Sequence, residues 1–480
     1  MIATIVEQLA EMLSIRKYWW AHFFGATFVL FSILFSIMVI RYSPRDVVIL
    51  MKHAGIYSAD LRVVGLFLFA WVVLYTLFFL NIKKVVHNKP SMRIILLWTV
   101  IVIAVMFVTP PFFSSDLYGY ISRASISNIH QVTPYAPTPA ELGYEEVVAW
   151  PYGGLVYGPV FASYITIVNK FVGTNVIANL FVFRMIGVIS FFLCALLLYQ
   201  IMKITNPGYL LSGAALFLMN PFFQVEIIHS AHNDVFMLLG ILVFIYLLLQ
   251  KKYNIAMVPI AVTFLIKFGT IVLAPVLWLL IMRQTISIIK KLKQIVLSVI
   301  LFITMVVLFY IPFWENFFGN VTHSGLVFIG ASYLTLPQSI VYIIVLLTSN
   351  FISNQAVLVQ LSSALKIIMF ALWYGGLLFF VRQWRDSLIV SRIFWVLMAL
   401  LLLLGGKLNI WYLLWAAPLV LLIPKPFYRV MLILLTVHGF LYYAWLNVFF
   451  PNTIVSVIAI LVALVMSMYT KKPSSLTATS

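Results

Sequence analysis

The sequence predicts an all-α polytopic membrane protein, and two features of the chain carry that prediction. Hydrophobic residues make up 64% of its 480 residues, whereas charged residues make up only 9%. A soluble globular domain has about 25% charged residues, so this chain is too apolar for that class. Its apolar residues also form runs of about 20, the length at which an α-helix crosses a bilayer. We therefore expect about 12 transmembrane helices, within a range of about 11 to 14.

The basic residues are distributed as in a membrane protein. The formal net charge is +18, but Lys and Arg stand in short clusters between the apolar runs. Such clusters orient a polytopic protein by remaining on the cytoplasmic side. No basic module interleaved with aromatic residues accompanies the charge, so we expect no binding of nucleic acid. The single cysteine, Cys194, lies within an apolar run, which excludes a disulfide within the chain and a cysteine metal site.

The first three spans are expected at Trp19–Ile40, Leu61–Asn81 and Ile94–Val108. A basic turn separates the second span from the third. Its residues are Lys83, Lys84, Lys89 and Arg93. If this turn is cytoplasmic, the third span delivers the loop at 110–157 to the outer face of the membrane.

Two later regions do not read as simple crossings. Ile255–Met282 is apolar around a central Lys267, with basic clusters at both ends, so we expect it to enter and return with Lys267 near the outer face. Tyr157–Val172 and Asn175–Met202 cannot both be full crossings if Lys203 is cytoplasmic. We interpret residues 1–472 as one integral-membrane domain in the cell membrane, and 473–480 as a disordered tail.

The loop at 110–157 is the longest polar interruption in the chain. It holds four acidic residues and one basic residue, Arg123, although the whole protein is strongly basic. Asp116 follows directly on the third span, within Ser114-Ser115-Asp116-Leu117-Tyr118-Gly119-Tyr120. Ser-Ser-Asp before an apolar turn is also good helix-capping chemistry, so Asp116 is either a cap or a functional carboxylate.

Ionisable side chains at the outer face come from at least six stretches of sequence, and such groups at a membrane are functional candidates. They are Asp116, Arg123, His130, Glu145, Glu146, Glu226, His229, His232, Asp234, Lys267, Glu315, His323 and Lys407. Several have a structural alternative. Asp234 suits either substrate binding or the N-terminus of a helix over Val235–Leu249. Glu226 and Glu315 are possible charge partners of Lys267 or Lys407. His229 and His232 have no close third ligand, so a metal site is weakly supported.

The order of short motifs resembles one family of enzymes. Asp116-Leu117-Tyr118-Gly119-Tyr120, Arg123, Pro134-Tyr135 and Tyr157-Gly158-Pro159 are similar to the first outer loop of the GT-C superfamily of glycosyltransferases. Later pieces of similar kind are Met219-Asn220-Pro221, His232-Asn233-Asp234, Lys267 with Pro275, and Asn409-Ile410-Trp411-Tyr412-Leu413-Leu414-Trp415 with Pro418. The greatest likeness is to bacterial mannosyltransferases that use polyprenyl-phosphate mannose, and it extends over roughly 95–420.

The resemblance implies inverting transfer of a sugar, most simply mannose, from a polyprenyl-phosphate donor to a glycolipid, polysaccharide or protein of the cell envelope. Such a reaction needs a base for the acceptor hydroxyl and fixed positive charge for the departing phosphate. We assign Asp116 as the base. The expected phosphate-binding residues are Arg123, Lys267 and Lys407, and the expected substrate-binding residues are Tyr118, His130, Tyr157, His232, Asp234, Trp411 and Tyr412. A lipid monophosphate donor does not demand a divalent ion, and we expect no metal or other cofactor.

The chain departs from the family pattern in two places. Related branches often carry an acidic pair in the first loop, whereas Asp116 stands between Ser115 and Leu117. A His-Pro pair commonly precedes the tryptophan of the later motif, where this chain has Asn409-Ile410. The alternative from another class is a transporter or lipid flippase, which would have matching broken helices in its two halves. Only one such break, near Lys267, is evident. An inactive scaffold of the same fold is disfavoured by Asp116 and the basic residues.

Overall fold

The computed structural model shows a helical protein and describes residues 14–43, 61–148, 151–152, 154–319, 355–379, 388–404 and 409–443. Within these ranges the chain forms helices and no β-strand, so the all-α prediction is confirmed. The α-helices are α2 (Trp19–Tyr42), α4 (Leu61–Leu80), α5 (Ile82–Val85), α6 (Lys89–Val108), α7 (Asp116–His130), α8 (Pro159–Val172), α9 (Val176–Thr205), α10 (Leu210–Leu218), α11 (Pro221–Gln224), α12 (Asp234–Leu249), α13 (Met257–Phe264), α14 (Ala274–Met282), α15 (Ile288–Tyr310), α18 (Gln355–Phe379), α19 (Ile389–Ala399) and α20 (Pro426–Leu441). Short 3-10 and π segments join them: η2 (Ala140–Leu142), η3 (Pro207–Tyr209), η4 (Val225–His229), η5 (Phe268–Leu273), η6 (Ile311–Asn316), η9 (Leu400–Leu404), η10 (Ile410–Trp415) and η11 (Ala417–Leu422).

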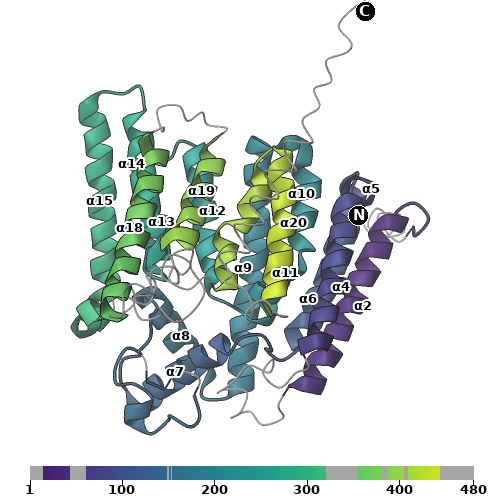
Figure 1. Cartoon of the computed structure of the whole chain (residues 1–480), viewed down its shortest axis with the longest axis horizontal. Helices are drawn as coiled ribbons and strands as arrows, with labels where there is room; N and C mark the ends of the chain where they lie inside the picture. Colours follow the sequence, from purple (N-terminus) through teal and green to yellow (C-terminus); the bar gives the residue numbers. More distant parts are fainter. Residues whose placement is uncertain are drawn as a thin grey trace, which may run out of the picture.

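The first three predicted spans are present as α2, α4 and α6, which lie together at one edge of the bundle (Figure 1). Helix α6 begins with a capping box, in which the Asn88 side chain accepts from the Ser91 N–H and Ser91 Oγ accepts from the Asn88 N–H. Helices α2 and α6 pack closely because Gly25 has no side chain. A Cβ there would lie 2.1 Å from the Trp98 ring.

Five helices in the described ranges are long and apolar enough to cross a membrane, and a bent pair allows a sixth. They are Trp19–Tyr42, Arg62–Leu80, Lys89–Val108, Val176–Thr205 and Ile288–Gly319. Their outward faces carry bare apolar side chains, such as Leu66, which is 70% exposed. Such surfaces suit contact with lipid rather than water. The expected total of about 12 crossings stays a prediction, because the described ranges do not cover the whole chain.

The bent pair joins α10 to α11 and η4 at an angle of 50°. Pro221 stands at the break, where the Asn220 side chain accepts hydrogen bonds from the Phe222 and Phe223 N–H groups and donates one to Thr436 of α20. These bonds satisfy backbone donors that a broken helix would otherwise leave unpaired. Segment η4 is a π-helix, a form that is frequent at functional sites.

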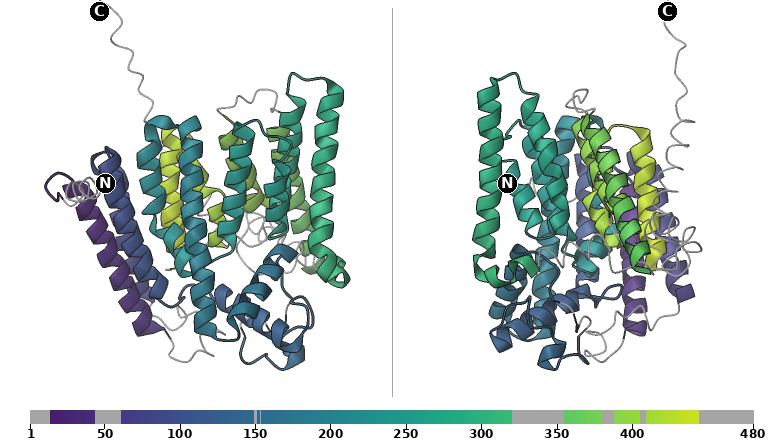
Figure 2. Two further views of the ribbon diagram at one scale, coloured as in Figure 1. Left: turned by 180° about the vertical axis from the view of Figure 1, so that it is seen from behind. Right: turned by 60° about the vertical axis from the view of Figure 1, so that its left-hand side comes forward.

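Helices α7 and α8 lie at one end of the bundle in two views (Figures 1 and 2). They pack against each other, and both also contact α9. The polar segment at 110–157 was expected to be a loop, but it contains the 15-residue helix α7. On the other side of the site, Lys267 lies between α13 and η5, and α13 and α14 both pack against α15. The candidate site forms where these elements meet.

Candidate active site

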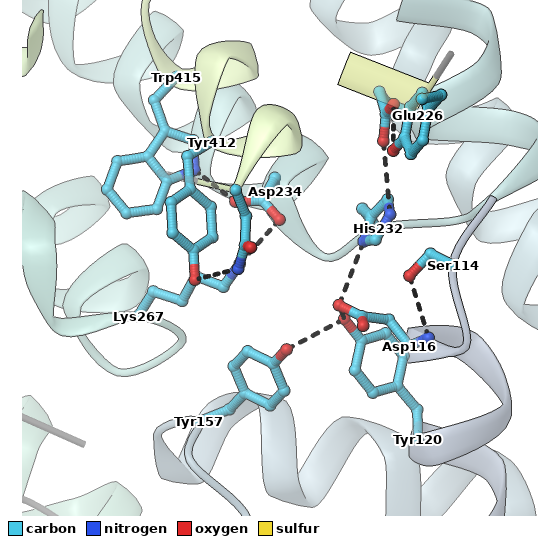
Figure 3. Close-up of polar contacts among 12 residues, drawn as sticks. Ser114, Asp116, Tyr120, Tyr157, Glu226, His232, Asp234, Lys267, Tyr412 and Trp415 are labelled. Atoms are coloured by element: carbon cyan, nitrogen blue, oxygen red, sulfur yellow. Dashed lines mark hydrogen bonds and ion pairs between the residues drawn. The ribbon is translucent and has the colours of Figure 1, made fainter. Parts of the chain in front are cut away.

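Asp116 is the first residue of α7. Its N–H donates a hydrogen bond to Ser114 Oγ (3.1 Å), and Ser115 occupies the N-cap position. The carboxylate is buried and contacts Tyr120 and His232, as Figure 3 shows. This geometry does not support the interpretation of Asp116 as a helix cap. It directs the carboxylate toward other elements of the fold.

Tyr120 contacts the Asp116 carboxylate, and Tyr157 contacts Tyr120. Tyr120 lies one helical turn later, where an i+4 side chain shares the same face, and its hydroxyl donates to Asp116 Oδ2 at 3.4 Å. The hydroxyl groups of Tyr120 and Tyr157 are 3.3 Å apart. Tyr157 precedes α8, so this contact ties the beginnings of α7 and α8 together.

His232 lies between two carboxylates. Its Nδ1 is 3.4 Å from Asp116 Oδ2, and its Nε2 is 3.4 Å from Glu226 Oε2. The imidazole is fully buried and stacks on the Trp411 ring, with centroids 4.3 Å apart and planes 12° apart. Glu226 also accepts a hydrogen bond from the Tyr443 hydroxyl at 2.8 Å.

A second cluster surrounds Lys267. Its Nζ donates to Asp234 Oδ2 at 2.7 Å, and Trp415 Nε1 donates to the other oxygen, Oδ1, at 2.6 Å. Lys267 Nζ also lies 5.3 Å from the ring centroid of Tyr157, 4.7 Å from that of Tyr412 and 6.0 Å from that of Trp415. Aromatic rings at these distances attract a cation. The lysine is therefore held as a cation in a buried position.

The residues around Asp116 and His232 and the residues around Lys267 form one site. His232 and Asp234 are separated by a single residue, and Tyr157 contacts both Tyr120 and Lys267. Burial disfavours the charged form of Asp116, but the adjacent His232 and the positive charge of Lys267 outweigh burial and lower the pKa of the carboxyl group. Burial likewise opposes protonation of His232, but the neighbouring carboxylates, Asp116 first, raise the pKa of the imidazole. The site thus holds an ionised carboxylate beside a fixed cation.

Gly158 places the start of α8 against the segment that precedes Lys267. The Gly158 N–H donates to the Ile266 carbonyl (2.9 Å), and the Val160 N–H donates to the Leu265 carbonyl (3.0 Å). A Cβ on Gly158 would lie 2.3 Å from that Leu265 oxygen. Only glycine allows the two backbones to approach so closely, and this approach positions Tyr157 beside Lys267.

Comparison with known proteins identifies the family. A family model described as the alpha-(1->6)-mannopyranosyltransferase N-terminal domain matches residues 20–283, more than half of the chain. The chain belongs to the alpha-(1->6)-mannopyranosyltransferase family. This is a mannosyltransferase family of GT-C type, so the resemblance seen in the motifs is confirmed, and the protein is a glycosyltransferase. No curated protein and no solved structure matches the chain.

The mannosyltransferase brings most of the residues predicted for its site into contact. Those that lie within the two clusters are Asp116, Tyr157, His232, Asp234, Lys267, Trp411 and Tyr412. They come from α7, the start of α8, the segment around the start of α12, the break after α13, and η10. Among the described residues, no group of three or more His, Cys, Asp or Glu side chains could hold a metal ion.

Other predicted residues of the mannosyltransferase lie apart from these contacts. His130 is at the far end of α7, where its Nε2 is 3.1 Å from the Tyr144 hydroxyl. Tyr118 is buried two residues after Asp116, which turns it to another side of the helix. Arg123 lies two turns after Asp116 and donates to the Pro137 carbonyl at 3.4 Å. Burial lowers the pKa of Arg123 to about 10, so it remains a cation at neutral pH. Lys407 lies outside the described residues.

The structure also adds residues that sequence reasoning did not assign to the site. Glu226 was a candidate partner for Lys267 or Lys407. In the structure it faces His232, and Asp234 is the carboxylate that pairs with Lys267. Trp415 could have been found from its place one turn after Tyr412 in an aromatic motif. No local signal points to Tyr443, which reaches Glu226 across 217 positions of sequence.

Replacing Gly158 by alanine should reduce mannosyl transfer by about tenfold or more, because the new Cβ would push α8 away from the Leu265 carbonyl. The measurement is the initial rate of transfer in membranes with matched protein content. Gly208→Ala is the control, since a Cβ at Gly208 meets nothing within 4 Å. A Gly158→Ala protein as active as Gly208→Ala would contradict the assigned role of this backbone contact.

Proposed function

We propose that this mannosyltransferase moves mannose from a polyprenyl-phosphate donor to a hydroxyl group of a cell-envelope glycan, glycolipid or protein, at the outer face of the cell membrane. By the activity for which its family is named, the new bond would be α-(1→6), so the acceptor group would be a primary hydroxyl. The configuration would invert from a β-linked donor to an α-linked product. Asp116 is the proposed general base, and Lys267 the proposed phosphate ligand.

One observation carries this proposal: a buried carboxylate and a buried ammonium group lie in one site, joined through tyrosines. Tyr157 contacts Tyr120, which binds Asp116, and also lies 5.3 Å from Lys267 Nζ. A base and a fixed cation are the two groups that transfer from a sugar phosphate requires. Arg123 would add a second cation on the same helix as Asp116.

The proposed step is a displacement at the anomeric carbon of mannose. The acceptor oxygen attacks the anomeric carbon on the face opposite the phosphate, and its proton passes to the Asp116 carboxylate. The bond between the anomeric carbon and the phosphate oxygen breaks, and its electron pair leaves with the phosphate. Lys267 would stabilise the charge that develops there. A base that is kept ionised by His232 is ready for this step at neutral pH.

Unpaired polar groups beside these clusters support the binding of a polyhydroxylated substrate. Both amide atoms of Asn233 are buried without a hydrogen-bond partner, and so are both ring nitrogens of His229. Asn233 stands in the chain between His232 and Asp234. A buried polar group without a partner costs about 1–3 kcal/mol, and sugar hydroxyls would remove that cost.

The test is transfer of radiolabelled mannose in liposomes that contain the purified protein and a synthetic mannoside acceptor. We expect label to reach the mannoside from polyprenyl-phosphate mannose but not from a nucleotide-linked mannose, and NMR of the product should show an α-(1→6) bond. Transfer only from the nucleotide sugar would overturn the proposed donor. Movement of the intact donor lipid across the bilayer with no transfer would favour the alternative function, a flippase.

A further inference from the structure

A buried line of four side chains leads away from Asp116 into the bundle. Asp116 contacts His232, His232 contacts Glu226, and Glu226 accepts from Tyr443. The side chains of His232 and Glu226 have no exposed surface at all. The four residues come from α7, the segment before α12, η4 and the helical residues directly after α20 (Figure 3 labels the first three).

His232 is fixed so that each ring nitrogen faces one carboxylate. Trp411 stacks on the ring, and the backbone N–H of His232 donates to the backbone carbonyl of Glu226 at 3.0 Å. Arg184 anchors the same segment, since its Nε and Nη2 donate to the His229 carbonyl at 3.1 and 2.6 Å. A neutral imidazole has one nitrogen without a proton, and that lone pair would here face a carboxylate oxygen. The arrangement therefore suits an imidazolium between two carboxylates.

We propose that Glu226 is a positioning residue for the transfer reaction: it keeps His232 protonated, and through His232 it keeps Asp116 ionised as the base. This inference rests on the proposed function of Asp116. Glu226 touches neither donor nor acceptor in this assignment and acts only through the imidazole. The hydrogen bond from the Tyr443 hydroxyl orients its carboxyl group.

Glu226 has a role that Asp116 cannot fill. When Asp116 takes up the proton of the acceptor, its negative charge disappears, and the His232 cation loses that partner. Glu226 still faces the other nitrogen, so the cation remains compensated inside the protein. Without Glu226, proton transfer would leave an isolated buried cation, which is strongly disfavoured.

The other charged groups near this line are already engaged. Asp234, which also acts on His232, is paired with Lys267. Lys267 also stabilises the charged form of Asp116 through its positive charge. Arg184 lies near His229, and its guanidinium donates to backbone carbonyls. Glu226 is therefore the carboxylate available to His232 when Asp116 becomes neutral.

The test is the pH dependence of kcat/KM for mannosyl transfer in the intact protein and in Glu226→Gln. Loss of the Glu226 charge should lower the pKa of His232, so the alkaline limb should move to lower pH by about one unit or more. His232→Gln should instead raise the pKa of Asp116 and move the acidic limb to higher pH. A His232→Gln protein lacks the alkaline limb that the imidazole sets, and adding Glu226→Gln in that background should leave the acidic limb where it is. Tyr75→Phe, which removes a buried tyrosine hydroxyl donating to the Leu216 carbonyl, is the control and should keep the normal profile.

If Glu226→Gln is active and both limbs of its pH profile are unchanged, the inference is overturned, whatever the rate of transfer. Glu226 would then be a structural residue. If Glu226→Gln does not insert, nitrogen-15 NMR of histidine in the intact protein decides. His232, assigned by comparison with His232→Gln, should carry protons on both ring nitrogens at neutral pH, and a neutral ring would overturn the inference. Failure of the proposed function looks different, since the intact protein would then not transfer mannose or Asp116→Asn would remain active.

Discussion

Asp116→Asn is expected to reduce mannosyl transfer by about 10²- to 10⁴-fold, the contribution of a general base. Asparagine preserves the volume of the side chain but cannot accept the proton of the acceptor hydroxyl. The measurement is single-turnover transfer from polyprenyl-phosphate mannose, with donor binding determined separately. Binding of the donor should change far less than the rate, because Lys267 and its aromatic neighbours are left in place.

Glu141→Gln is the matched control for this substitution. Glu141 is an acidic residue of the same segment between α6 and α8, but it is exposed and accepts hydrogen bonds from the Thr138 N–H and hydroxyl. Its replacement makes the same chemical change away from the site and should leave transfer intact. Full activity in Asp116→Asn, with normal membrane insertion of both variants, would remove Asp116 from the role of base.

The helices that are determined by long apolar runs could be predicted from the sequence. Long apolar runs specify α2, α4 and α6. The expectation of a single helix break, near Lys267, was wrong, because a second break lies at Pro221 within the Asn220-Pro221 pair. The π-turn of η4 could not be predicted, because it has no signature in apolar periodicity. It depends on contacts with α9 and α6 that form only in the folded chain.

The candidate site likewise has a part that could be predicted from the sequence and a part that could not. Residue type and membrane position singled out Asp116, Asp234 and Lys267, since charged groups at membrane depth are rarely without function. The pairing of those groups could not be read from the chain. Asp234 meets Trp415 across 181 positions and Lys267 across 33, and no spacing rule connects residues so far apart. Partners that lie one helical turn apart, such as Tyr120 and Asp116, are within reach of sequence reasoning.

Removing Lys267 should have two separable effects, because the ammonium group both pairs with Asp234 and is proposed to bind the donor phosphate. Lys267→Met leaves the Asp234 carboxylate buried, with Trp415 as its one remaining side-chain donor in the part of the chain that the structure describes. Loss of one partner of a buried pair costs about 3–5 kcal/mol. We expect a lower temperature of unfolding in detergent and a fall in transfer of about 10²-fold or more.

The double variant Lys267→Met/Asp234→Asn separates these effects. The asparagine removes the unpaired charge and keeps an oxygen for the Trp415 N–H, so the thermal stability should return toward that of the intact protein. Donor binding should not return, since no cation remains to meet the phosphate. Asp234→Asn alone is the control: it keeps the lysine and should keep donor binding. If the double variant bound the donor as tightly as the intact protein, Lys267 would serve only to neutralise Asp234, and Arg123 would become the leading candidate for the phosphate.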